Sequence, residues 1–248
     1  MNWTWFHKLG SPKWFFLWSK SYALPLFFLG SVALVVGLIW GLAFTPADYL
    51  QGNSFRIIYI HVPVAILAQS CYLGLGFSGL IFLIWQMKIA PIFIQSIAPI
   101  GAVMALIALV SGAVWGKPTW GTWWVWDARL TSVLVLFLLY MGIIGLKNAL
   151  DDVALANKSV AVIGAVGLIN LPIIKYSVIW WNTLHQGATF TLTEKPAMAA
   201  EMWIPLLISV IGMYCLVASL VLWRMQSIIL EREHRSNWVK QEVMNNGF

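Results

Sequence analysis

Long apolar segments alternate with short polar connections along the 248 residues of this chain. Six of these segments approach or exceed the roughly 20 apolar residues that a transmembrane helix needs. They run from Tyr22 to Phe44, Val62 to Met87, Ile97 to Trp115, Leu130 to Leu146, Ser159 to Trp180 and Trp203 to Trp223. This pattern predicts an all-α integral membrane protein with six transmembrane helices, and the even number of crossings places both termini on one side.

The fifth apolar segment contains two residues that disturb a regular span. Pro172 and Lys175 both fall in its last third. A proline inside a helix removes one backbone hydrogen bond, and a lysine near the end of a span extends its amine toward the surface. Of the six spans, this one is therefore the least clearly defined by hydropathy.

The segments outside the spans predict one bundle domain with two short extensions. Residues 1–21 mix aromatic and basic side chains and are expected to lie at the membrane surface. Residues 22–223 form the six-helix domain, which includes a tryptophan-rich loop at 115–129. The charged tail 224–248 is expected to be a solvated cytoplasmic helix that continues the sixth span, with Trp238 on its surface.

Composition supports the membrane assignment and excludes several functions. The chain is 60% hydrophobic and 10% charged, whereas soluble domains run at roughly 45–50% and about 25%. The two cysteines, Cys71 and Cys215, lie alone inside apolar segments, with no C-x-x-C or Cys/His pattern. The sequence therefore offers no basis for a disulfide, a structural zinc site or covalent haem attachment through its own thiols.

The distribution of charge predicts the orientation of the helices. The net charge is +6, but the cations sit at the ends of apolar segments, so no nucleic-acid partner is needed to explain them. If both termini are cytoplasmic, ten cations are cytoplasmic and five are external. The cytoplasmic ten are Lys8, Lys13, Lys20, Lys88, Lys147, Lys158, Arg224, Arg232, Arg235 and Lys240, and the external five are Arg56, Lys117, Arg129, Lys175 and Lys195. This asymmetry fits the positive-inside rule.

That orientation brings three unusual segments to the external face: residues 43–63, 115–129 and 180–198. The middle segment, WGKPTWGTWWVWDAR, contains five tryptophans, two cations and one carboxylate. Tryptophan combines a flat apolar face with one N–H, which suits either the membrane interface or the face of another planar molecule. A belt of interfacial anchors and a platform for a planar ligand both remain open at this point.

Two of the four histidines lie on the same external face. His61 stands before Val62 and Pro63, which indicates that it caps or opens the second helix, and His185 follows Trp180 and Trp181 just outside the fifth. Each histidine alone would be an ordinary interfacial side chain. As a pair at matched depth, they could supply two axial nitrogens to a haem.

The surrounding residues add the other parts of a haem site. The tryptophans offer apolar faces for a porphyrin, and Arg56, Lys117 and Arg129 offer cations for its propionates, although anchoring to lipid headgroups is an equal alternative for the cations. Asp127 could pair with Arg129, cap the fourth helix, or do both. A zinc or copper site would also use the imidazoles, but the sequence provides no third ligand for it.

Two other classes of function compete with a haem-holding protein. A permease would carry haem or a small solute through the bundle, but the predicted spans contain few ionisable residues at their middles, where translocation pathways usually have them. A redox subunit such as a quinone-linked cytochrome b would normally place its axial histidines within helices.

The string WGTWWVWDAR resembles the tryptophan-rich WWD motif of haem-handling proteins in cytochrome c maturation. Within that superfamily, the phrases FTPADYLQGNSFRIIYIHVP, SGAVWGKPTWGTWWVWDARLTS and NLPIIKYSVIWWNTLHQG resemble the CcmC family. The resemblance covers nearly the whole chain, and it includes the six spans and the short N-terminal segment.

The resemblance implies a protein of the bacterial inner membrane that binds haem b without a covalent bond and delivers it to the haem chaperone CcmE. It implies a delivery protein and not an enzyme, working with the ATP-binding cassette subunits CcmA and CcmB and the small protein CcmD. His61 and His185 match the axial ligands of the family. The WWD residues of the family match Trp115, Trp120, Trp123, Trp124, Trp126 and Asp127.

Overall fold

The computed structural model describes residues 8, 10–185 and 198–246, and these residues form helices joined by short connections. His7 and Lys195 lie outside the described residues. Six helical segments are long and apolar enough to cross a membrane, which confirms the predicted all-α, six-span architecture. They cover Pro12–Phe44, Asn53–Trp85, Ile89–Trp120, Ala128–Ala149, Val153–Trp180 and Ala200–Arg232.

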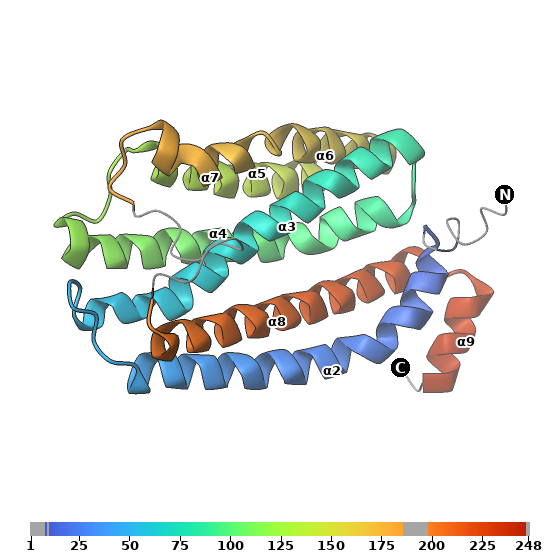
Figure 1. Ribbon diagram of the computed structural model, residues 1–248. Helices are drawn as coiled ribbons and strands as arrows, with labels where there is room; N and C mark the ends of the chain where they lie inside the picture. Colours follow the sequence, from blue (N-terminus) through green and yellow to red (C-terminus); the bar gives the residue numbers. More distant parts are fainter. Residues whose placement is uncertain (1–7, 9, 186–197, 247–248) are drawn as a thin grey trace, which may run out of the picture.

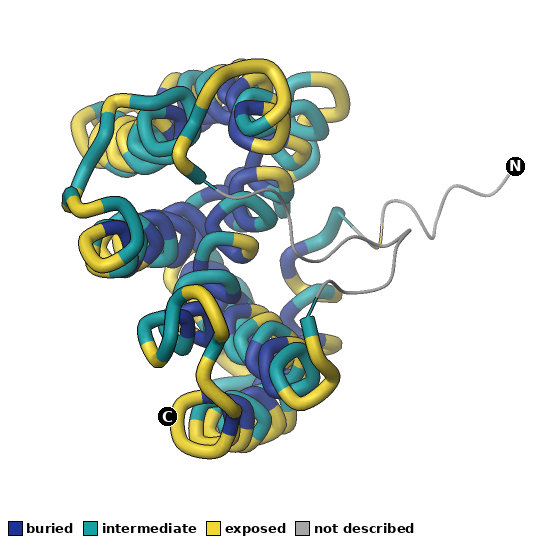
Figure 2. The backbone as a smooth tube through the Cα atoms, turned by 60° about the vertical axis from the view of Figure 1, so that its left-hand side comes forward, coloured by how far each residue is buried: buried dark blue, intermediate teal, exposed yellow. Residues whose placement is uncertain are grey.

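The helices lie roughly along one direction in a single bundle (Figure 1). They are α2 (Pro12–Ile39), α3 (Ile58–Trp85), α4 (Ile89–Trp120), α5 (Ala128–Ala149), α6 (Val153–Gly167), α7 (Asn170–Trp180), α8 (Ala200–Arg232) and α9 (Asn237–Asn246). A π-helical turn, Trp40–Phe44, extends α2, and a 3₁₀ turn, Asn53–Ile57, leads into α3. Buried positions gather between the helices and exposed ones lie on the outer faces (Figure 2).

Small residues allow α2 and α8 to pack closely along their lengths. A Cβ atom added to Gly30 would lie 2.5 Å from the backbone nitrogen of Leu216, and one added to Gly212 would lie 2.5 Å from that of Leu34. Lipid tails are as apolar as the helix surfaces, so close backbone contact of this kind is a main source of stability between membrane helices. The outer face of α2 remains apolar and exposed, as a lipid-facing helix requires.

The fifth span is a broken helix. Helix α6 ends at Gly167 and α7 begins at Asn170. Pro172 has no N–H for the carbonyl of Leu168, four residues earlier, and its ring would clash with that carbonyl in a continuous helix. The amide of Asn170 donates to the carbonyl of Ser132 on α5 over 2.9 Å and so ties the break to its neighbour.

Several helix boundaries differ from those predicted by hydropathy. Helix α2 begins at Pro12, about ten residues before the predicted span, because proline suits the first helical position. Helix α4 continues to Trp120 and ends at Gly121, whose φ of 78° is typical of a helix terminus. The predicted loop 115–129 is therefore wrong in its first part, because residues 115–120 are helical.

The C-terminal tail was also predicted incorrectly as one continuous solvated helix. Helix α8 continues to Arg232, the chain turns, and α9 folds back against the start of α2. Lys20 forms an ion pair of 2.7 Å with Glu242, and the Trp238 ring lies 5.6 Å from that of Phe16. Trp238 is thus a packing residue of the tail and not a free surface aromatic.

Candidate functional site

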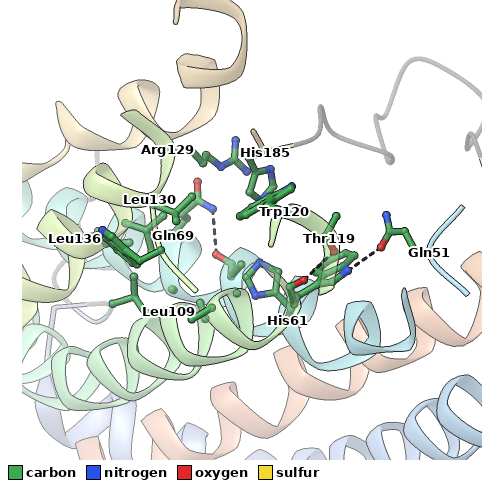
Figure 3. Close-up of a pocket in the computed structure, with 18 residues that line it drawn as sticks. Gln51, His61, Gln69, Leu109, Thr119, Trp120, Arg129, Leu130, Leu136 and His185 are labelled. Atoms are coloured by element: carbon green, nitrogen blue, oxygen red, sulfur yellow. Dashed lines mark hydrogen bonds between the residues drawn. The ribbon is translucent and has the colours of Figure 1, made fainter. Parts of the chain in front are cut away.

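A pocket opens among α3, α4 and α5 near the tryptophan-rich end of the bundle (Figure 3). It holds about 880 Å³ of space between atoms, part of which is open to solvent. Most of its wall is apolar, and its polar groups come from a few side chains. The lining residues named by the sequence are His61, His185, Trp115, Trp120, Trp124 and Arg129. The structure thus brings residues from three separate segments to one cavity.

His61 lies in the first turn of α3, because this helix begins at Ile58. Of the two roles expected for His61, it therefore has the second: it lies in the opening turn of α3 and is not the N-cap, which is Ile57. Its Nδ1 atom lies 2.9 Å from Oγ of Ser111 on α4. The same hydroxyl donates to the carbonyl of Ile107 over 2.6 Å, so it is left to accept a hydrogen bond from Nδ1–H of His61. That tautomer leaves Nε2 with a free lone pair for a metal ion.

The spacing of the two imidazole rings is close to that of two histidines that bind one metal ion. The ring centres of His61 and His185 lie 6.5 Å apart, at an interplanar angle of 38°. Two metal–nitrogen bonds of about 2 Å each, plus the distance from each nitrogen to its ring centre, add up to roughly 6 Å. The predicted pairing of the two histidines is therefore compatible with axial ligation of one iron from opposite sides.

The five motif tryptophans divide into two groups. Trp115, Trp120 and Trp124 line the pocket, whereas Trp123 and Trp126 are 55% and 77% exposed. Each histidine has a tryptophan neighbour: the ring centre of Trp115 lies 5.7 Å from that of His61, and that of Trp120 lies 6.2 Å from that of His185. The inner group can therefore contact a ligand between the histidines.

The indole N–H groups of Trp115 and Trp124 differ in their hydrogen bonding. The indole N–H of Trp115 donates to Oε1 of Gln51 over 2.8 Å, which fixes the end of α4 to the connection before α3. The indole nitrogen of Trp124 is buried and has no hydrogen-bond partner among the described residues. A buried donor without a partner is costly, so a ligand oxygen in the pocket would be a favourable acceptor for it.

Only one of the three predicted propionate cations lines the pocket. Arg129 does so, and its guanidinium is held by the carbonyl of Ile174 at 3.0 Å. Arg56 is turned away and donates to the carbonyls of Leu42 and Thr45 over 2.7 and 2.6 Å, near the π-helical turn. Lys117 donates to the carbonyl of Gly121 over 3.1 Å at the end of its own helix. Arg129 is thus the cation placed to meet a ligand carboxylate.

Asp127 acts as the N-cap of α5, one of the two roles expected for it. Its Oδ1 accepts from the backbone N–H of Leu130 over 2.8 Å. Its Oδ2 accepts a short hydrogen bond from the Thr183 hydroxyl, whose oxygen in turn accepts from the backbone N–H of His185 over 3.0 Å. Asp127 forms no ion pair with Arg129 among the described residues. It therefore ties the start of α5 to the segment that carries His185.

Several residues that line the pocket or hold its histidines carry no signal in the sequence. Ser111 and Gly112 stand in an apolar stretch of α4, and both contact the His61 ring. Gln69 lines the pocket from α3, one face of which also carries His61 and Ala65. Nothing in the sequence distinguishes Thr183, which contacts Asp127 and the backbone of His185, from other polar loop residues. These contacts depend on how α3 packs on α4 and on the path of the chain after α7, which hydropathy does not encode.

The fold and this pocket define a multi-pass helical membrane protein with a paired-histidine, tryptophan-lined cavity at one end. Residues 5–240 match the profile of the CcmC family, described as heme exporter protein C. The chain belongs to this family.

Curated relatives support the same assignment. The chain is 47% identical over 253 residues to heme exporter protein C of Escherichia coli strain K12, with 99% of each chain covered. It is 45% identical over 244 residues to that of Haemophilus influenzae, covering 96% of this chain and 97% of the relative. It is 42% identical over 221 residues to that of Bradyrhizobium diazoefficiens, covering 89% and 84%.

Proposed function

We propose that this chain holds haem b in the pocket between His61 and His185 and passes it to the chaperone CcmE during maturation of c-type cytochromes. The observation that carries the proposal is the pair of imidazoles, 6.5 Å apart, inside a tryptophan-lined cavity. The relatives are known as heme exporter protein C, a name that makes haem the cargo of those proteins. The mostly apolar walls of this pocket suit the faces of a porphyrin.

In this proposal each group of pocket residues has one task. His61 and His185 bind iron from opposite sides, which saturates its coordination and discourages oxygen chemistry. Trp120 and Trp124 contact the porphyrin, and Arg129 binds a propionate. His185 lies after the end of α7 and His61 lies within a helix, so release of His185 is the simpler way to open one face of the iron.

The chain is proposed to act as a binding and delivery protein, with no reaction of its own. The residues that line the pocket include no cysteine to bond a haem vinyl group. Haem is therefore expected to stay non-covalent here and to become covalently bound only on CcmE, with orientation of the vinyl edge as the contribution of this chain. CcmA, CcmB and CcmD are the proposed partners, with the ATPase activity supplied by the CcmA and CcmB subunits.

The proposed location is the bacterial inner membrane, with both termini cytoplasmic and the pocket at the periplasmic face. The support is the ten-to-five distribution of cations between the two ends. Reporter fusions at Asp151 and after Arg232 should then report the cytoplasm, and a fusion at Thr122 should report the periplasm. A cytoplasmic signal at Thr122 would contradict the proposed orientation.

The ligand assignment is tested on the purified protein by optical spectroscopy. The wild type should show a low-spin bis-imidazole spectrum, and acid–acetone should extract its haem. His61→Ala and His185→Ala should each leave haem five-coordinate or lost, with partial recovery on addition of imidazole. His234→Ala is the matched control, because His234 is an exposed histidine of the C-terminal tail.

Three outcomes would contradict the proposal. An unaltered low-spin spectrum in either pocket variant would remove that histidine from the ligand set. Uptake of haem into the lumen of sealed vesicles by this chain alone would favour the permease. Reversible electron exchange with a quinone would favour the redox subunit.

A further inference from the structure

A second pocket lies at the opposite end of the bundle from the paired histidines. It is formed by the first part of α4, the end of α5, and one side each of α6 and α8, and holds about 510 Å³ of space between atoms. Gln95 of this pocket and Trp115 of the histidine pocket are 20 residues apart on α4, which corresponds to about 30 Å along a helix. The two pockets are therefore separate sites.

Three cations surround this second pocket, and each is held in place by a neutral oxygen. Lys147 donates to Oδ1 of Asn157 over 2.8 Å, and Arg232 donates to Oε1 of the lining residue Gln95 over 2.7 Å. Arg224 uses Nε to bind the carbonyl of Ser96 over 3.2 Å. These contacts fix the positions of the cations, and the partners in them carry no negative charge.

No carboxylate among the described residues forms an ion pair with these three cations. The one ion pair found there joins Lys20 to Glu242. Asp152, near the same end, uses its carboxylate to cap α6 by accepting from the backbone N–H groups of Ala154 and Leu155. Glu231 interacts electrostatically with its neighbour Arg232, and Arg232 and Lys147 repel each other. Positive charge gathered at one end of the bundle in this way attracts anions from outside the chain.

The walls of the pocket define the class of that anion. They are mostly apolar and come from Pro91, Ile94, Ala98, Pro99, Ile143, Ile144 and Val160. A free polyanion would gain nothing from such walls, whereas acyl chains would pack against them. The lining includes no histidine and no aromatic ring, so it offers haem neither an axial ligand nor a face to stack on.

We propose that this pocket binds the phosphate headgroup of an anionic phospholipid, with Lys147 and Arg224 as direct contacts and Arg232 as a nearby cation. The acyl chains follow the apolar wall into the bilayer. Basic pockets between membrane helices are a known way to hold a lipid phosphate, and each cation contributes about five-fold to its affinity. The lipid would stabilise the junction of α4, α5 and α8 at this end of the bundle.

The test compares variants of the full chain after delipidation in mild detergent. Binding is measured with vesicles of phosphatidylethanolamine that either contain or lack cardiolipin, and lipids retained from the original membrane are identified by native mass spectrometry. We expect cardiolipin to copurify with the wild type. Lys147→Gln and Arg224→Gln should each weaken binding about five-fold, and the double variant about 25-fold. Lys158→Gln is the matched control, because Lys158 is exposed on α6 and does not line the pocket.

Four results would overturn the proposal. The first is equal cardiolipin binding by the double variant and by the Lys158→Gln control. The second is equal retention of neutral and anionic lipids by the wild type. Displacement of the lipid by inorganic phosphate, but not by chloride at the same ionic strength, would assign the site to a free anion. Loss of haem from the double variant in lipid-free detergent would assign the site to a haem carboxylate.

Circular dichroism and elution volume confirm folding of each variant, and the single variants carry the test if the double variant does not fold.

Discussion

Ser111 holds the imidazole of His61 through a hydrogen bond of 2.9 Å to Nδ1, from the helix that packs against α3. This contact directs the free lone pair of Nε2 into the pocket. Ser111→Ala should therefore lower haem affinity by about 10-fold to 100-fold, the usual effect of removing a group that orients a metal ligand. The measurement is a haem titration followed by the low-spin absorption bands.

Ser96→Ala is the matched control for this variant. Ser96 lies on the same helix, is fully buried, and donates to the carbonyl four residues earlier, as Ser111 does. It has no contact with the histidine pocket. If both variants lose haem equally, the effect of Ser111 is on helix stability and not on the tautomer of His61.

Gly112 leaves room for the His61 ring. A Cβ atom added there would lie 3.0 Å from Cε1 of His61, which is closer than an ordinary contact. Gly112→Ala should push the ring and lower haem affinity roughly ten-fold, because the orientation of the ligand changes. Gly142→Ala on α5 is the control: nothing lies within 4 Å of the added Cβ, so haem affinity should be unchanged.

The inner and outer tryptophans should separate holding haem from passing it on. Trp120→Ala and Trp124→Ala remove rings that line the pocket and should each lower haem affinity about ten-fold. Trp126→Ala removes a ring that is 77% exposed and should leave the affinity unchanged. If Trp126 contacts the chaperone, the rate of covalent haem formation on CcmE falls in this variant, because exposed tryptophans are typical interface anchors.

The tryptophan variants need a matched control, and Trp238 is unsuitable because it packs against Phe16. Trp85→Ala serves instead, since Trp85 is 56% exposed at the end of α3 away from the pocket. Normal haem transfer in all of the Trp120, Trp124 and Trp126 variants would indicate that these tryptophans only anchor the protein at the membrane interface.

Substitution of Arg129 and of Arg56 should affect haem affinity differently, although the sequence predicts the same role for both. Arg129→Gln removes a cation from the pocket wall and should lower haem affinity about ten-fold, as expected for loss of a charged hydrogen bond. Arg56→Gln should leave the spectrum unchanged but lower the thermal stability, because two carbonyls near the π-helical turn lose their donor. Haem loss in Arg56→Gln alone would reverse this assignment.

The six spans could be predicted because length and apolarity alone decide whether a helix can cross a bilayer. Their ends could not, because a helix such as α4 continues through Pro118 and Lys117 into the interface. The proximity of His61 to His185 could be predicted, because six spans place the segment before α3 and the segment after α7 at the same end of the bundle. Ser111 and Gly112 could not be found, because their roles depend on the rotation of α4 against α3.

The division of the tryptophans was likewise hidden from the sequence. Residues 115–120 are helical and 121–126 are not, so no single periodicity tells which of the five rings faces inward. Arg56 and Arg129 are equally basic in the sequence. Only the fold shows that Arg56 is held by carbonyls outside the pocket.

Asp127 offers a test that separates helix capping from positioning of His185. Asp127→Ala removes the N-cap of α5, which costs about 1 kcal/mol of stability, and also removes the acceptor for Thr183, whose hydroxyl oxygen holds the backbone of His185. Asp127→Asn keeps a good capping side chain but replaces the carboxylate acceptor. Both variants should weaken the axial bond from His185, seen as a shift toward five-coordinate haem that added imidazole reverses.

Asp152→Ala is the matched control, because it removes the equivalent cap of α6 at the other end of the bundle. It should cost similar stability and leave the haem spectrum intact. A normal spectrum in Asp127→Ala, with only the stability reduced, would make this aspartate a helix cap alone.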